Sequence, residues 1–176
     1  ATGTAIWATH FIAMLAYQPR LQVGYQLGLT LGSLLLAIAV TGAGCAIAAS
    51  AGTGRARLAA GGLVIGLGIG SMHFTGMAAF QVAGHLAWQP EFVAASWALG
   101  LGFGAAAMLA FRLGATARRL AVPLLLILAI AGLHFTAMAA ASILPDPTLA
   151  LAGGIASSWL LAVLVAQAAL VLLAIA

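Results

Sequence analysis

The sequence has very few charged residues. Only 5% of its 176 residues are charged, there is no lysine, and aspartate and glutamate together number two. Soluble domains carry roughly 25% charged residues, and a soluble protein of this composition would expose much of its apolar surface. The composition therefore excludes a soluble globular domain. The few charges, a net +4 carried by arginine, bear on membrane orientation and lipid headgroups, so we expect no nucleic-acid partner.

Reactive side chains are scarce as well. A single cysteine, Cys45, excludes a disulfide framework, and we interpret it as a buried small hydrophobe. No acidic residue or lysine falls inside an apolar run, so a carboxylate proton relay or an ion-coupled transport site has no material. No set of nucleophile, base and orienting group is visible, so we do not expect an enzyme.

Long apolar runs, by contrast, recur along the whole chain, and about 20 such residues span a bilayer. Because every backbone polar group in lipid must be paired internally, these runs predict an all-α membrane protein with six transmembrane helices. The expected spans are 1–18, 21–48, 58–82, 92–112, 120–143 and 149–176. Ala1 falls inside the first apolar run, which indicates that this helix begins upstream of the sequence.

The arginines predict the orientation of the spans. Two alternate loops contain five of the six: Arg55, Arg57, Arg112, Arg118 and Arg119. The other loops hold Arg20, His85, Glu91 and Asp146. Since basic loops stay in the cytoplasm, we expect the odd-numbered spans to run outward and to end at the periplasmic side.

A His-Phe-x-x-Met motif occurs three times, once near the outer end of each odd-numbered span. The pairs are His10 with Met14, His73 with Met77, and His134 with Met138. Residues four apart share a helix face, so each copy presents an imidazole and a thioether in one direction. Parallel helices with these side chains at one depth can converge on a shared point near the periplasmic side.

The spacing of the motifs indicates a tandem repeat. His10 and His73 are 63 residues apart, and His73 and His134 are 61 apart. Each unit then contains two helices, with boundaries near 1–57, 58–119 and 120–176. We expect one transmembrane domain with the three helix pairs around a pseudo-threefold axis.

Imidazole and thioether ligands without carboxylate or thiolate favour copper, especially Cu(I). An ionisable residue in a membrane helix is costly and usually functional, although three histidines could also act as hydrogen-bonding glue between helices. Met72 occurs in the middle copy only, and Thr75 and Thr136 fit a bond to their own backbone as well as a ligand role. The sequence leaves the part of these three residues open.

The three copies, above all Met72-His73-Phe74-Thr75, resemble the MHYT domain of bacterial membrane sensors. The resemblance covers essentially the whole chain, with Phe where that motif has Tyr, and it implies one further helix upstream. It also implies a sensory input domain in the bacterial cytoplasmic (inner) membrane that binds copper and perceives a diatomic gas (oxygen, nitric oxide or carbon monoxide) or the redox state. Cytoplasmic output modules of the family include cyclic-di-GMP synthases and phosphodiesterases and histidine kinases.

Two alternatives remain open at the level of sequence. Two of the histidines could be axial ligands of haem b in a membrane cytochrome or haem-based sensor. Thioethers near the outer surface would also fit a copper transporter, but Met108 and Cys45 are isolated in the sequence and predict no ladder of ligands toward the cytoplasm.

Overall fold

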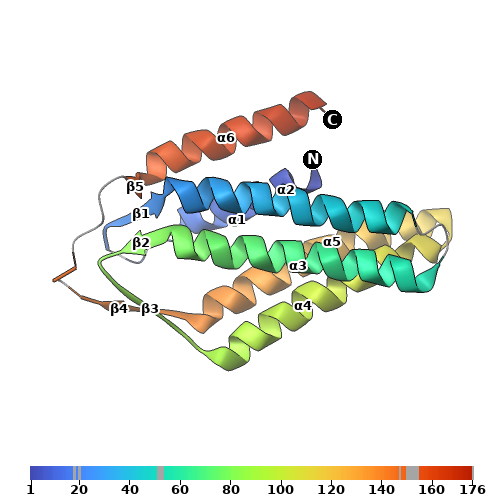
Figure 1. Ribbon diagram of the computed structural model, residues 1–176, viewed down its shortest axis with the longest axis horizontal. Helices are drawn as coiled ribbons and strands as arrows, with labels where there is room; N and C mark the ends of the chain where they lie inside the picture. The colour runs from blue at the N-terminus through green and yellow to red at the C-terminus, as the bar shows by residue number, and fades with distance from the viewer. Residues whose placement is uncertain (18, 20, 51–53, 147, 150–154, 176) are drawn as a thin grey trace.

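The computed structural model describes residues 1–176 except 18, 20, 51–53, 147, 150–154 and 176, and leaves the side chains of 155, 172, 173 and 175 undescribed. Helices account for most of the described chain (Figure 1). They are α1 (Thr2–Ala16), α2 (Leu27–Ala49), α3 (Arg55–Ala79), α4 (Pro90–Leu109), α5 (Ala115–Ala140) and α6 (Ser158–Ile175), with a 3₁₀ turn, η1 (Ala110–Arg112), after α4.

Four of these helices are long and apolar enough to cross a membrane: α2, α3, α4 together with η1, and α5. The apolar helices α1 and α6 are shorter. The prediction of a helical multi-pass membrane protein is confirmed at this level, whereas six full crossings are not.

The connections at one end of the bundle form short strands, where the sequence predicted helix ends and loops. They are β1 (Val23–Gln26), β2 (Phe80–Val82), β3 (Gly84–Trp88), β4 (Ala141–Pro145) and β5 (Ile155–Ala156). One antiparallel sheet has the order β2-β1-β5, and β3 pairs with β4. The expected spans were therefore too long at this end, because the backbone beyond each helix finds its hydrogen-bond partners in another connection.

Consecutive helices from α1 to α5 pack closely on one another. α2 packs on both α1 and α3, and α4 packs on both α3 and α5. Glycines allow the backbones to approach: a β-carbon on Gly44 would lie 2.7 Å from the Gly61 carbonyl oxygen, and one on Gly104 would lie 2.6 Å from that of Gly62. Such small-residue faces are typical of membrane helix pairs.

The last helix departs from this pattern. The main helix neighbour of α6 is α1, and α6 diverges from the bundle toward its C-terminus (Figure 1). A full threefold arrangement would place α6 between α5 and α1, as α2 and α4 lie between their neighbours. The structure does not confirm that arrangement.

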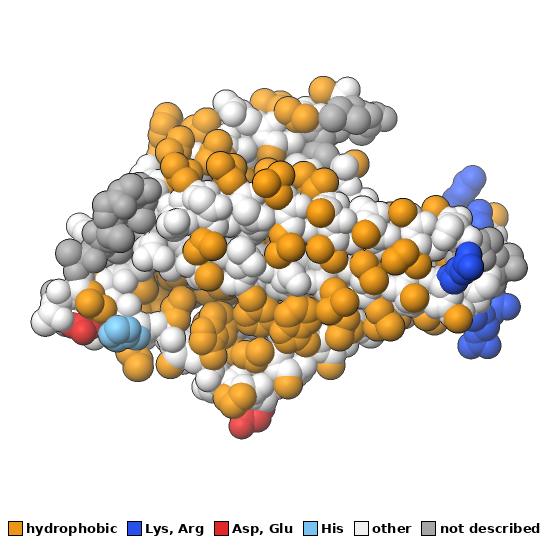
Figure 2. Space-filling model, in the orientation of Figure 1, with side chains coloured by type: hydrophobic (Ala, Val, Ile, Leu, Met, Phe, Trp, Pro, Cys, Tyr) orange, Lys and Arg blue, Asp and Glu red, His pale blue; other side chains and the backbone are white. Residues whose placement is uncertain are grey.

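Charge is divided between the two ends of the bundle. The arginine side chains gather at the end opposite the strands, as Figure 2 shows. Arg55 begins α3, and Arg112 lies in η1, next to the start of α5. His85 and Asp146 lie at the strand end. Arg20, predicted for an outer loop, lies outside the described residues.

Candidate metal centre

Three histidines from three helices meet in the interior. His10 comes from α1, His73 from α3 and His134 from α5, and each lies six residues before the last residue of its helix. They are 2%, 1% and 7% exposed. The three histidines thus share one register relative to the ends of their helices.

The Nδ1 atoms of the histidines form a nearly equilateral triangle. The distances are 3.2 Å between His10 and His73, 3.2 Å between His10 and His134, and 3.3 Å between His73 and His134. The ring centroids are farther apart, at 4.9–5.2 Å, and the rings are nearly perpendicular, at 78–87°. The imidazoles are thus arranged as a three-bladed propeller with their Nδ1 atoms nearest the centre.

Hydrogen bonds alone cannot satisfy this triangle. A neutral imidazole nitrogen is either a donor or an acceptor. Among three Nδ1 atoms, at least two must therefore be of the same kind and face each other without a bond. A buried polar contact of this kind is costly, because the unmatched atoms have also lost water.

A cation removes the conflict, since it accepts a lone pair from all three nitrogens at once. A triangle with sides of 3.2–3.3 Å has its centre about 1.9 Å from each corner, close to the Zn–N distance of roughly 2.0–2.1 Å. Within the part of the chain that the structure describes, this is the one group of three or more metal-ligating His, Cys, Asp or Glu side chains. The donor set and its size both fit one metal ion.

The methionines of the motifs follow one helical turn after the histidines. Met14 and Met77 are 1% exposed, and Met138 is half-buried. The backbone carbonyl of each methionine accepts a hydrogen bond from the N–H of the residue that caps the end of its helix. These capping residues are Tyr17, Phe80 and Ala141 respectively. The repeated cap keeps the three methionines in one register, so they remain candidate ligands by position.

The model of the family MHYT, described as a bacterial signalling protein N-terminal repeat, matches residues 3–61 and 66–123, about two thirds of the chain. The chain belongs to the MHYT family. The matched segments contain the first two motifs, and the third motif, in 120–176, stays a prediction from the sequence spacing.

Relatives of this MHYT chain are signalling proteins by name. An uncharacterised signalling protein of Caulobacter vibrioides is 45% identical over 148 residues, which is 84% of this chain and 18% of that protein. The bifunctional diguanylate cyclase/cyclic di-GMP phosphodiesterase MucR of Pseudomonas aeruginosa is 39% identical over 183 residues (100% and 27%). The cyclic di-GMP phosphodiesterase NbdA of the same organism is 39% identical over 145 residues (78% and 18%).

The chain therefore spans about a fifth to a quarter of the length of these relatives. No solved structure matches it.

One residue of the MHYT site was missed by sequence reasoning. Gly76 lies against the His10 ring, and a β-carbon there would be 2.6 Å from His10 Nε2. The other two copies have Ala13 and Ala137 at this position. The single glycine among three aligned motifs was the available signal for this close approach.

The outward nitrogens of two histidines lack partners. Nε2 of His10 and of His73 is buried, and among the described residues neither has a hydrogen-bond partner. If Nδ1 binds a metal, Nε2 carries the proton and becomes a buried donor. Metal-bound histidines usually donate this proton to a second group, so here orientation depends on packing against Gly76 and the flanking phenylalanines.

The centre is open on one side. A cavity of about 160 Å³ lies between α1 and α5. Its lining is apolar apart from Thr9, His10 and His134, and the remaining lining residues are Ala13, Ile127, Ile130, Ala131 and Phe135. Two of the three histidines can thus be reached laterally from between these helices.

A second, larger cavity of about 400 Å³ lies in the other half of the bundle. Cys45 and Met108, which the sequence treated as isolated, both line it. Since they lie on different helices, their juxtaposition could not be inferred from spacing.

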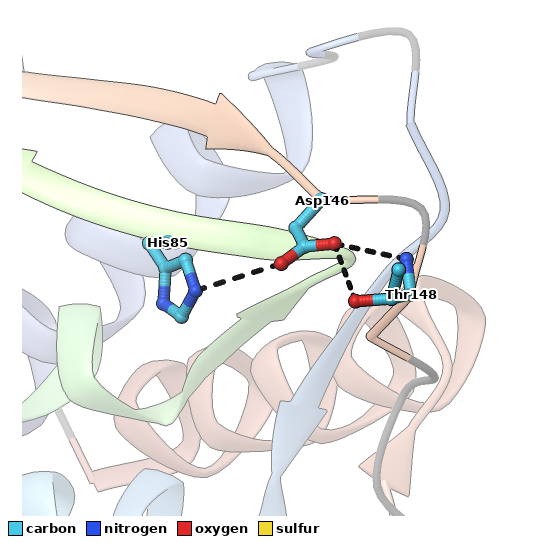
Figure 3. A network of polar contacts seen from close by, with 3 residues as sticks. All are labelled: His85, Asp146 and Thr148. Carbon is cyan, nitrogen blue, oxygen red and sulfur yellow. Dashed lines mark hydrogen bonds and ion pairs between the residues drawn. The ribbon is translucent and has the colours of Figure 1, made fainter.

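The remaining histidine is outside the MHYT centre. Asp146 Oδ2 is 3.9 Å from Nε2 of His85, whose side chain is 69% exposed (Figure 3). Asp146 Oδ1 accepts hydrogen bonds from the Thr148 hydroxyl, at 2.6 Å, and backbone N–H, at 2.9 Å. These two bonds are the main reason why the pKa of Asp146 lies below its usual value, with the charge of His85 a smaller cause.

Proposed function

We propose that this chain is the membrane-embedded sensory input domain of a longer bacterial signalling protein, and that His10, His73 and His134 hold a copper ion. The observation that carries the proposal is the triangle of Nδ1 atoms 3.2–3.3 Å apart, which hydrogen bonds cannot satisfy and one ion can. Membership of the MHYT family supports the sensory role.

Met14, Met77 and Met138 would supply thioether ligands beside the imidazoles. Their shared register, one turn after each histidine, supports this assignment. Neutral nitrogen and thioether donors suit copper, whereas zinc prefers Cys, His and carboxylate.

Bound copper would supply an open coordination position for oxygen, nitric oxide or carbon monoxide, or a change of oxidation state. The residues of the chain orient the imidazoles and exclude water from them. A sensor of this kind signals only if its ligand binds two arrangements of the helices with different affinity.

The partners follow from the relatives. Two of them are named for cyclic di-GMP synthesis or breakdown, so we propose a cytoplasmic output module of that class, or a histidine kinase, beyond this chain. The chain itself would have no enzymatic activity. It would lie in the bilayer of the inner membrane, as three two-helix repeats with the motifs near the periplasmic side.

A haem-binding sensor is less well supported. Two axial histidines of haem b must lie on opposite faces of a flat macrocycle. Here the three Nδ1 atoms are 3.2–3.3 Å apart and the imidazoles contact one another edge to face, which leaves no space for a porphyrin between them.

A copper transporter has one observation in its favour. The cavity lined by Cys45 and Met108 lies in the half of the bundle away from the motifs. Copper flux into proteoliposomes containing the purified protein separates transport from sensing, and no flux is expected.

Metal content and an optical spectrum of the same purified sample test the proposal. After anaerobic reconstitution with Cu(I), we expect about one copper per chain and no Soret band, one ion being what a single tripod of imidazoles holds. His73→Asn should abolish this binding, while the exposed His85→Asn should leave it unchanged. Copper that is retained in His73→Asn, with unchanged thermal stability of the metal-free protein, would refute the site.

A further inference from the structure

The repeat aligns α6 with α4. Ser158-Trp159 in α6 stands 62 residues after Ser96-Trp97 in α4, and Phe135 stands 61 residues after Phe74. Trp159 is therefore the counterpart of Trp97, and Phe135 that of Phe74.

In the middle repeat, α4 covers one face of α3. Trp97 stacks on Phe74, with ring centroids 5.6 Å apart and an angle of 16° between the rings. The same indole lies against Gly70, and a β-carbon on Gly66 would lie 2.6 Å from the carbonyl oxygen of Gly100. This side of the histidine cluster is closed by aromatic stacking and close backbone contact.

In the third repeat, the corresponding face of α5 is open. Ile127, Ala131 and Phe135 are the counterparts of Gly66, Gly70 and Phe74, and all three line the lateral cavity beside His10 and His134. Phe135 is 65% exposed and Trp159 is 74% exposed. The stacked pair of the middle repeat thus has both of its counterparts exposed.

The residues that α6 buries also differ from those expected by comparison with α2 and α4. Ser33 and Ser96, at matching positions of α2 and α4, are both 0% exposed, whereas Ser158 is partly exposed. α6 buries Leu161 and Val165 instead, and its main helix neighbour is α1. The repeat therefore assigns to α6 a face of α5 that α6 does not cover in this structure.

We propose that α6 moves into the groove between α1 and α5 and stacks Trp159 on Phe135, closing the lateral opening to the histidine cluster. The structure described here is the open arrangement. The molecule that this opening would admit is a ligand of the bound metal, and this part of the inference rests on the proposed function.

The residues at the proposed contact between α5 and α6 predict a weaker contact than the one between α3 and α4. Ile127 and Ala131 replace Gly66 and Gly70 on α5, and Ala166 stands on α6 where α4 has Gly104. The larger side chains prevent the close backbone approach seen between α3 and α4. A loose contact can open and close, whereas the glycine-packed one stays shut.

The lining indicates the class of molecule that enters. The cavity of about 160 Å³ is apolar apart from one threonine and the two histidines, and it opens between helices whose exposed side chains, such as Ile12, Ile127 and Phe135, are apolar. Charged solutes are excluded from such a path because an unpaired charge in an apolar environment is costly. Small uncharged molecules that dissolve in the bilayer fit it.

Cross-linking of the metal-free protein tests the closure. Ile127→Cys and Ala162→Cys occupy the counterparts of Gly66 and Gly100, and Cys45→Ala removes the native thiol. In nanodiscs, a short bifunctional thiol reagent should link this pair, which blocks later labelling with PEG-maleimide. Ile127 is 59% exposed and Ala162 is half-buried, so the substitutions should not disturb folding.

The stacking pair supplies the decisive control. Trp159→Ala should slow the cross-link roughly two- to tenfold, which is the population shift expected from losing one aromatic pair. Leu170→Ala, at another exposed position of α6, should leave the rate unchanged. A pair that stays unlinked, or one that links at a rate indifferent to Trp159→Ala, would overturn the inference.

The two proposals fail separately. The cross-link is measured without metal, so its absence leaves copper binding by His10, His73 and His134 standing. If the copper site is refuted, the movement of α6 over the lateral cavity can still be correct, and the cavity would then admit a molecule that does not bind a metal.

Discussion

Gly76 shows how one missing methyl group shapes the centre. The first and third motifs have Ala13 and Ala137 where the middle motif has this glycine, and at Gly76 the ring of His10 lies close against the backbone of α3. The three helices can therefore carry the same motif and still bring the Nδ1 atoms within 3.2–3.3 Å of one another.

Gly76→Ala should displace His10. The new β-carbon would lie 2.6 Å from Nε2, and relieving such an overlap in a packed interior costs about 1–3 kcal/mol. We expect a lower unfolding temperature in detergent and weaker copper binding. Gly32→Ala, which meets no atom within 4 Å, is the control; equal copper affinity in both variants would contradict the role given to Gly76.

Thr148→Val should raise the pKa of Asp146. The hydroxyl bond of Thr148 is the largest cause of the lowered pKa, so its loss moves the value back toward that of an ordinary aspartate. Because the folded-state pKa is depressed, this turn is most stable above the pKa of the unfolded chain and loses that stability as the pH falls through the folded value. A carboxyl ¹³C titration measures the shift, and His85→Ala should cause a smaller one.

The histidines and their common depth could be predicted from the sequence because i and i+4 positions fix a face and the repeat fixes a register. Their convergence to hydrogen-bonding distance also depends on Gly76, whose contact is with another helix. The opposite treatment of Phe11, which is buried, and Phe135, which is exposed, could not be predicted either, because the motif around them is nearly the same.

Among the elements, the helices followed from apolar length but their outer ends did not. Val23 pairs with Val82 in the sheet that joins β1 to β2, and Trp88 pairs with Ala141 in the other. These partners lie more than 50 residues apart along the chain, so no local period reveals them. Short apolar segments beside a helix read as its continuation until the pairing is known.

The α3–α4 contact depends on small residues. Gly104→Ala places a β-carbon 2.6 Å from the carbonyl oxygen of Gly62 and should force the helices apart, with a loss of about 1–3 kcal/mol. Gly102→Ala, two residues earlier and facing open space, should be neutral or stabilising by up to about 1 kcal/mol through helix propensity. Thermal unfolding of both variants in the same detergent distinguishes them.

For the whole molecule, the orientation in the membrane can be tested with two exposed positions at opposite ends. In a Cys45→Ala background, Leu144→Cys at the strand end should react with an impermeant maleimide added to intact cells. Leu113→Cys, beside Arg112, should react only after permeabilisation, because basic loops stay in the cytoplasm. The reverse pattern would invert the proposed topology.

The arrangement of six helices was predictable only in part. α2 packs on α1 and α3, and α4 packs on α3 and α5, but α6 packs mainly on α1, so the predicted threefold arrangement is not confirmed. The sequence repeat indicates which helix faces are equivalent. Because α5 has Ile127 and Ala131 where α3 has Gly66 and Gly70, it also predicts that α6 packs less tightly on α5 than α4 does on α3. How far it opens is a balance of packing energies that no motif encodes.

The strand β5 has a mechanical consequence for the helix that follows it. Tyr25 pairs with Ala156 in the antiparallel β1–β5 ladder, so α6 is hinged two residues before its start while its far end points toward the arginine-bearing end (Figure 1). Its 18 residues make a lever about 27 Å long. A tilt of α6 by about 10° around this hinge would move its C-terminal end by about 5 Å. A small rearrangement beside the histidines would thereby become a larger displacement at the opposite end of the bundle.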